Sequence, residues 1–168
     1  MRKGGGKEKG STQERAVCVA LSLWVSNGAK RDLYWRSAMS GGRATVGAKR
    51  GIDLARQAGD ISAVAPEGHA LTNKFFIECK AYKDLNLEAF IVSNKGLLAK
   101  FWQTAQTEAK RHNREPVIIA KGNFMPTLII TRHKFPLNMN PLARLPTCVI
   151  GLFERTLKTR FNAEEMGL

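Results

Sequence analysis

The segment Phe75-Phe76-Ile77-Glu78-Cys79-Lys80 joins strand-forming residues to two opposite charges. Phenylalanine and isoleucine favour extended backbone. Glu78 and Lys80 are separated by Cys79 alone, so both project from the same face of a strand. The segment therefore predicts a strand that carries a carboxylate and an ammonium group side by side.

A second apolar run precedes this strand. Asp60 opens it, residues 61–65 continue it, and Pro66-Glu67-Gly68 ends it. The pattern predicts a β-hairpin whose loop is too long for a minimal turn. In an antiparallel hairpin the start of the first strand faces the end of the second, so we expect Asp60 to lie close to Glu78 and Lys80.

Two carboxylates and an ammonium group at one end of a sheet favour a metal-binding, hydrolytic centre. Hard oxygen ligands suit Mg²⁺, or Mn²⁺ as a substitute, with water and substrate phosphate completing the shell. Such a metal could polarise a phosphodiester and lower the pKa of a bound water, while Lys80 could stabilise the developing charge or position the nucleophile. Repulsion by Glu78 is expected to raise the pKa of Asp60. The alternative is a solvated ion pair on an edge hairpin.

The charge balance points to a polyanionic partner. Lys and Arg number 27 against 14 Asp and Glu, a formal charge of +13 in 168 residues. Nucleic acid or an acidic membrane surface are the partners that such an excess favours. The apolar helix expected near the N-terminus lacks a basic amphipathic face, which disfavours the membrane. We expect no small-molecule substrate.

The three cysteines show neither disulfide nor zinc spacing. A reducing cytoplasm fits best. The apolar run at residues 16–25 follows a long basic start but is too short to span a bilayer, so we interpret it as a core helix.

The chain is expected to form one nuclease domain with terminal additions. Residues 1–10 predict a flexible basic arm, residues 11–135 the domain, and residues 136–168 a C-terminal extension of it. Ser11-Thr12-Gln13-Glu14 has the pattern of a capping box and Asn27-Gly28 that of a helix end. Further helices are expected at 87–92 and 97–112, and strands at 33–37, 117–121, 127–131 and 148–153.

The motif around the first strand resembles the signature of the PD-(D/E)xK nuclease superfamily. Asp60, 17 intervening residues and Glu78-Cys79-Lys80 follow the pattern, with Gly59 where the namesake proline often stands. The resemblance implies an α/β, restriction-endonuclease-like fold with a mixed central β-sheet flanked by helices.

The ordered set of motifs is similar to archaeal-type Holliday junction resolvases, from residue 7 to about residue 121. The matching pieces are Lys9-Gly10, Gln13-Glu14-Arg15, Arg36-Ser37-Ala38-x-Ser40-Gly41-Gly42, Gly59-Asp60-Ile61 and Ile77-Glu78-Cys79-Lys80. The resemblance implies hydrolysis that leaves a 5′-phosphate. A junction cutter nicks two strands symmetrically, which implies a homodimer.

The resemblance also implies roles for individual residues. Glu14, Asp60, Glu78 and the backbone carbonyl of Cys79 would hold the metal. Lys80 would be the catalytic lysine, Ser40 a catalytic or phosphate-contacting hydroxyl, and Asp60 and Glu78 part of the catalytic set. The residues expected at the DNA are Lys9, Arg36, Arg43, Lys49, Arg50 and Gln103. For Glu14, a simple capping role is the alternative.

One departure from the resemblance is a longer link between the serine segment and the aspartate. Residues 41–59 carry five glycines and four cations, which suits a loop that grips phosphate. A short helix at 52–58 is expected within it, and Asp53 is a rival for the first aspartate. The insertion leaves junction specificity open.

The leading hypothesis is a Mg²⁺-dependent DNA endonuclease, most like a Holliday junction resolvase acting in DNA recombination. If it is virus-encoded, it would work in the cytoplasm or nucleoid of the host cell. One alternative is a nuclease for flap, nicked or duplex DNA. The other is a non-catalytic, basic nucleic-acid-binding module.

Overall fold

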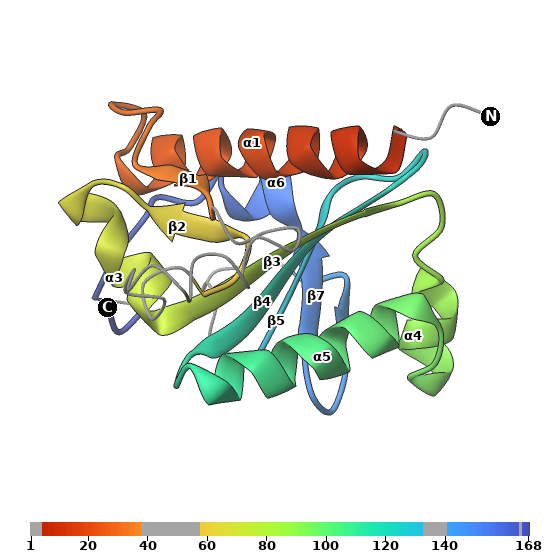
Figure 1. Ribbon diagram of the computed structural model, residues 1–168. Coiled ribbons are helices and arrows are strands. Elements are labelled where there is room, and N and C mark those ends of the chain that lie inside the picture. The colour runs from red at the N-terminus through yellow and green to blue at the C-terminus, as the bar shows by residue number, and fades with distance from the viewer. Residues whose placement is uncertain (1–4, 38–57, 133–140, 165) are drawn as a thin grey trace, which may run out of the picture.

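The computed structural model describes residues 5–37, 58–132, 141–164 and 166–168. Five helices and seven strands are formed in this part of the chain, and they are labelled as in Figure 1. The helices are α1 (Gly5–Val25), α3 (Pro66–Lys74), α4 (Leu87–Ser93), α5 (Leu97–Arg111) and α6 (Phe153–Thr156). The strands are β1 (Tyr34–Arg36), β2 (Ile61–Ala63), β3 (Phe75–Tyr82), β4 (Glu115–Gly122), β5 (Leu128–Thr131), β6 (Ala143–Arg144) and β7 (Val149–Leu152).

A five-stranded mixed sheet forms the centre of the molecule, in the order β3-β4-β5-β7-β6. β3 and β4 are parallel and the other pairs antiparallel. A parallel pair needs a crossover, and α4 and α5 supply it. In Figure 1, α1 and α6 lie on one side of the sheet and α4 and α5 on the other. This confirms the expected mixed sheet flanked by helices, as in the restriction-endonuclease-like fold.

Alternate residues of the sheet fill two separate cores. Toward α1, the strands contribute Phe75, Ile77, Cys79, Val117, Ile119 and Ile129. Toward α5, they contribute Ile118, Ala120, Leu128, Ile130 and Ile150. Because β4 and β5 are buried on both faces, they are apolar without alternation. The predicted strands at 117–121 and 127–131 and the predicted helices at 87–92 and 97–112 are confirmed.

The predicted hairpin between residues 60 and 80 is wrong. Residues 66–74 form α3, and β2 pairs with β1 in a two-stranded antiparallel sheet in which Trp35 faces Ser62. Pro66 begins α3 rather than ending structure, because the fixed φ of proline suits the first turn of a helix, where its missing N–H is not needed. The short strands of residues 143–144 and the helix at 153–156 were not predicted either.

Helix α1 begins earlier than the capping box predicts. It starts at Gly5, so Ser11 is inside the helix and does not cap it. Its end is as predicted: Asn27 has φ +51° and Gly28 φ +90°, and the Gly28 N–H donates to the Leu23 carbonyl. Lys9 lies in the first turns of α1.

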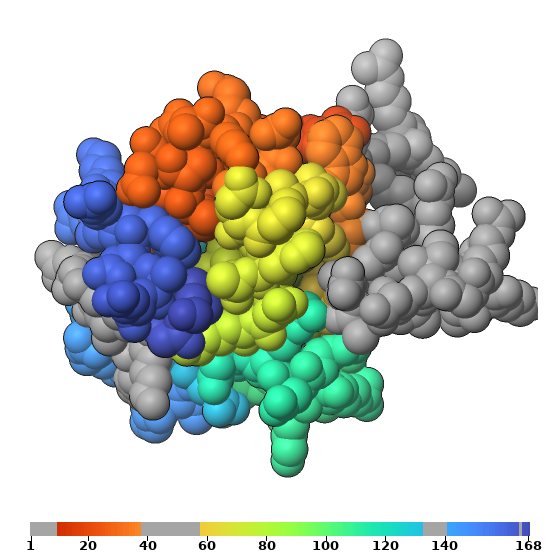
Figure 2. Space-filling view, turned by 90° about the vertical axis from the view of Figure 1, so that its left-hand side faces the viewer, coloured from red at the N-terminus to blue at the C-terminus, as the bar shows by residue number. Residues whose placement is uncertain are grey.

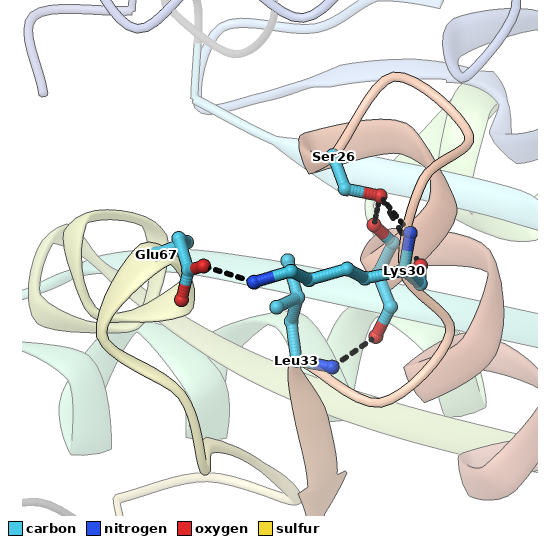
Figure 3. A network of polar contacts seen from close by, with 5 residues as sticks. Ser26, Lys30, Leu33 and Glu67 are labelled. Atoms are coloured by element: carbon cyan, nitrogen blue, oxygen red, sulfur yellow. Dashed lines mark hydrogen bonds and ion pairs between the residues drawn. The ribbon is translucent and has the colours of Figure 1, made fainter.

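The segment after α1 is tied to α3 by polar contacts (Figure 3). The Lys30 backbone N–H donates to Ser26 Oγ at 2.8 Å, and the Lys30 ammonium forms an ion pair with Glu67 of α3. Figure 2 shows the same side of the molecule, with α1 above α3 and the end of α5 below it. These contacts hold β1 and β2 beside the central sheet.

Several predicted features lie outside the described residues. They are Ser40, Arg43, Lys49, Arg50, Asp53 and the short helix expected at 52–58. In the part of the chain that the structure covers, no helix has the length and apolarity needed to cross a membrane. All three cysteines are free and buried.

Candidate active site

Asp60 is fixed at the open edge of β3 by backbone hydrogen bonds. Its N–H donates to the Ile77 carbonyl at 2.8 Å, and its carboxylate oxygen Oδ2 accepts the Cys79 N–H, also at 2.8 Å. On its other side, the Asp60 carbonyl accepts the Ser37 N–H at 2.9 Å. Asp60 thus joins the small β1-β2 sheet to the edge of the central sheet.

Gly59 makes this approach possible. Its φ is +86°, and a Cβ there would lie 2.6 Å from the Ile77 carbonyl oxygen. Real Cβ atoms do not come so close to backbone, and residues with a side chain rarely adopt that φ. Residue 59, where the superfamily often has proline, must therefore be glycine in this chain, because a side chain there would clash with β3.

Glu78 and Lys80 lie on the face of β3 that points toward α5. Their side chains are 18 % and 23 % exposed and form an ion pair. The Lys80 ammonium also lies 5.5 Å from the ring centre of Phe101 in α5, a cation–π distance. Burial lowers the pKa of Lys80, but the attraction of Glu78 outweighs it and the net shift is upward. Lys80 is therefore a fixed positive charge at neutral pH.

Glu14 reaches the same region from α1. It is buried and forms an ion pair with Arg36 of β1. Because it lies in the third turn of α1, the alternative of a capping glutamate is excluded. One turn further along α1, the buried Cys18 has its pKa raised to about 12, first by burial and then by the charge of Glu14.

The electrostatics show that the carboxyl groups act on one another. The pKa of Asp60 is raised to about 6, mainly by burial, then by the charge of Glu78 and to a lesser extent that of Glu14. The Cys79 N–H and the Lys80 ammonium oppose the shift. The predicted upward shift and the predicted proximity of Asp60 to Glu78 and Lys80 are confirmed, although burial is the larger cause.

Gln103 is not brought to this group. It follows Phe101 by two residues, which turns it about 200° around α5, away from Lys80. Gln103 is exposed and lines a separate hollow with Lys95 and Thr147. The residue of α5 that does reach the site is Phe101. The sequence placed Phe101 only on the apolar stripe of its helix, so no signal distinguished it from the core residues.

The arrangement agrees with a comparison against protein families. Residues 5–144 match the model of a family described as "Phage putative PDDEXK endonuclease". The chain belongs to this family. The match covers Glu14, Asp60, Glu78 and Lys80 and confirms a virus-encoded nuclease of the PD-(D/E)xK superfamily. Searches of curated proteins and of solved structures gave no match.

The carboxylates of this PD-(D/E)xK endonuclease fit a hard divalent cation. Within the described residues, no three His, Cys, Asp or Glu side chains are gathered closely enough to hold a metal, because Glu14 is turned to Arg36 and Glu78 to Lys80. Mg²⁺, however, needs only one or two protein carboxylates, since water and phosphate complete its shell. Asp60 and Glu78 are two carboxylates of the kind that such an ion takes, and in the structure Glu78 is paired with Lys80.

The backbone of Cys79 faces the same open edge of β3 as Asp60. Its N–H points to the open edge of β3, where Asp60 accepts it. Both backbone groups of a strand residue point to the same side, so the Cys79 carbonyl points to that edge as well. It therefore shares the edge with the carboxylate of Asp60.

A glycine substitution tests the edge geometry. We expect Gly59→Ala to displace Asp60 from β3, abolish cleavage and lower the free energy of unfolding by more than about 1 kcal/mol. Gly28→Ala is the matched control, because Gly28 also has a positive φ, of +90°, but no atom within 4 Å of the added Cβ. Urea unfolding and nuclease assays measure both effects. Equal behaviour of the two variants would contradict the steric role of Gly59.

The raised pKa of Asp60 predicts that replacing this carboxylate by a neutral side chain stabilises the protein, and that the gain depends on pH. Because the folded protein favours the protonated form of Asp60, this group contributes most to the stability of the unchanged protein below pH 3.8, the ordinary pKa of the carboxyl. The protein loses this contribution as the pH rises through about 6, where Asp60 ionises in the folded state. In the presence of chelator, Asp60→Asn should therefore gain stability over the unchanged protein between pH 4 and pH 7.5, by up to about 3 kcal/mol.

Urea unfolding at several pH values measures this gain. Asparagine keeps an oxygen that accepts the Cys79 N–H, so the substitution removes charge and little else. The exposed Asp32, changed to asparagine, controls for the loss of one carboxylate. A gain of the same size in the control, or none in Asp60→Asn, would contradict the assignment.

Proposed function

We propose that this phage-type endonuclease is a metal-dependent DNase selective for branched DNA, most like a Holliday junction resolvase. The observation that carries the proposal is the fixed position of Asp60 beside Glu78 and Lys80 at the edge of β3. The formal charge of +13 supplies the attraction to DNA.

Asp60, Glu78, Glu14 and the Cys79 carbonyl are the proposed metal-holding groups, with Mg²⁺ as the ion and Mn²⁺ as its substitute. When bound, the ion would polarise the scissile phosphate and make a water molecule more acidic. Burial raises the pKa of Asp60 and so disfavours its ionised form. A cation beside the carboxylate would stabilise that form. The negative charge of the site and the positive charge of the ion are thus complementary.

Lys80 is proposed to stabilise the negative charge that develops on the phosphate. Its raised pKa keeps it protonated, so it acts as a fixed charge rather than as a base. The ring of Phe101 limits where its ammonium group can lie. Lys80 is paired with Glu78 in the structure, and it would be free to contact the phosphate if Glu78 held the ion instead.

The remaining site residues are proposed DNA contacts. Arg36 holds Glu14 and lies at the end of β1, where it can also meet the DNA backbone. Ser40 is proposed as a catalytic or phosphate-contacting hydroxyl. The proposed cationic and polar contacts are Lys9, Arg43, Lys49, Arg50 and Gln103. Recognition of backbone and shape, rather than of bases, suits such a set.

The proposed assembly is a homodimer, because symmetric nicking of a junction needs two active sites related by a two-fold axis. The proposed setting is DNA recombination in the cytoplasm or nucleoid of a host cell. Family membership favours a nuclease over a non-catalytic binding module. Family membership does not distinguish between DNA structures, so a nuclease for flap, nicked or duplex DNA is the alternative.

Cleavage assays with matched substrates test the proposal. A four-way junction, a flap, a nicked duplex and a plain duplex of the same sequence are incubated with Mg²⁺ or with chelator. We expect symmetric, Mg²⁺-dependent nicks in the junction. Asp60→Asn and Lys80→Gln should each lower the rate by about 10² to 10³-fold while retaining binding. Lys83→Gln, which changes an exposed lysine after β3, is the control and should cut normally.

Other outcomes would revise or contradict the proposal. Preferred cleavage of the flap, nick or duplex would replace the junction specificity and keep the nuclease. Single rather than paired nicks would contradict the homodimer. Cleavage that persists in chelator would contradict the metal. Unchanged cleavage by Asp60→Asn or Lys80→Gln would contradict the assigned site.

A further inference from the structure

A second polar hollow lies apart from the candidate active site. It is a pocket of about 550 Å³ where α3 and α5 end and β3 and β4 begin. In Figure 2 the ends of α3 and α5 lie side by side on the face toward the viewer. The charged residues of its lining are Lys74, Lys110, Arg114, Glu115 and Arg132. None of them belongs to the proposed catalytic set.

The charges of this basic pocket are unbalanced. Among the described residues that line it, four cations and one carboxylate give a net charge of +3. The cations come from separate elements, since Lys74 ends α3, Lys110 lies in the last turn of α5, and Arg132 follows β5. Folding therefore brings like charges together from distant parts of the chain, which costs free energy unless an anion joins them.

Two of these cations, Lys74 and Arg132, are only weakly neutralised by the described residues around them. Glu115 Oε2 is buried and accepts no hydrogen bond within the described residues, and Arg132 Nε lies 3.7 Å from it. That distance is too long for a hydrogen bond, and the Arg132 side chain is 52 % exposed. The Lys74 ammonium donates to the main-chain carbonyls of Met166 and Gly167, which carry no net charge.

We propose that the basic pocket binds a backbone phosphate of the DNA, away from the phosphate that is cut. This inference rests on the proposed DNA endonuclease function and adds a second contact to it. Lysine and arginine converging on one hollow are the usual ligands of DNA phosphates. The pocket thus anchors the duplex while the edge of β3 does the chemistry.

The length of β3 sets the distance between the two contacts. Lys74 precedes Glu78 by four residues, which is about 13 Å along a strand. B-DNA rises about 3.4 Å per base pair, so for a duplex whose axis runs along β3 the pocket would reach a phosphate about four base pairs from the cut. Arg114 connects the two regions, because its Nη1 lies 3.5 Å from the carbonyl of Ala58, two residues before Asp60.

Two charge-matched double variants test the proposal. Lys110→Gln/Arg132→Gln removes two charges from the basic pocket, and Lys110→Gln alone, which changes an exposed lysine, is the milder variant. Arg155→Gln/Lys158→Gln removes two exposed charges at and after α6, on the other side of the sheet. All are made in the Asp60→Asn background, so that the DNA is bound and not cut. Fluorescence anisotropy then gives the affinity for labelled duplex and junction DNA between about 50 and about 300 mM KCl, a range over which the Debye length shortens and screening increases.

The salt dependence is the decisive quantity. Because the pocket would hold one phosphate, removal of both cations should flatten the slope of log K against log salt by about 0.9, and removal of Lys110 alone by less. The α6 control should change it by less than half as much as the pocket double variant. Equal slopes in the pocket and control variants would overturn the proposal.

Shortened DNA tests the distance. With fewer than about four base pairs on either side of the cut, the pocket variant and its parent should bind alike; with longer arms the parent should bind more tightly. An advantage of the parent that is independent of arm length would overturn the proposed position. If the unchanged protein neither binds nor cuts DNA, the proposed function itself fails. If it cuts DNA and the slopes are equal, only the pocket proposal fails.

Discussion

The hydrogen bonds between Asp60 and the open edge of β3 are the constraint on which the rest of the site depends. The small β1-β2 sheet has its own pairing, and Asp60 joins it to the central sheet by a backbone bond to Ile77 and a side-chain bond from Cys79. The same two bonds place the carboxylate next to Glu78 and Lys80. Because the approach leaves no space for a Cβ at residue 59, the position of a candidate catalytic group follows from the absence of a side chain beside it.

The site is an electrostatic compromise. Glu14 and Glu78 are neutralised by Arg36 and Lys80, whereas Asp60 accepts the neutral Cys79 N–H among the described residues, and its pKa rises to about 6. Such strain at a functional site is acceptable when a ligand relieves it. The basic pocket shows the opposite imbalance, with an excess of positive charge. The two regions together suit a polyanion such as DNA. A divalent cation bound with it would lie at the carboxylates, and one of its phosphates would lie in the basic pocket.

The sequence predicted the elements whose signal is local. Continuous apolar runs identified β4 and β5, and helical spacing identified α4 and α5, because burial dictates both patterns. The prediction of a hairpin was wrong because Pro66 was interpreted as the end of a strand rather than as the start of a helix. Asp60 still lies near Glu78, because it is bound to the edge of β3. The importance of Phe101 and the clash at Gly59 could not be predicted, since each depends on which segment packs against it. The start of α1 was also missed, because glycines and lysines give no periodicity.

Titration with Mn²⁺ by isothermal calorimetry, in buffers of different ionisation enthalpy, tests most directly whether Asp60 is the centre of a metal site. With a pKa of about 6, Asp60 is half protonated at pH 6, so binding should release about half a proton there and almost none at pH 8. Asp60→Asn should lose both the binding and the proton release. Mn²⁺ binding of unchanged affinity and proton release in Asp60→Asn would contradict the assignment of this carboxylate as a metal ligand.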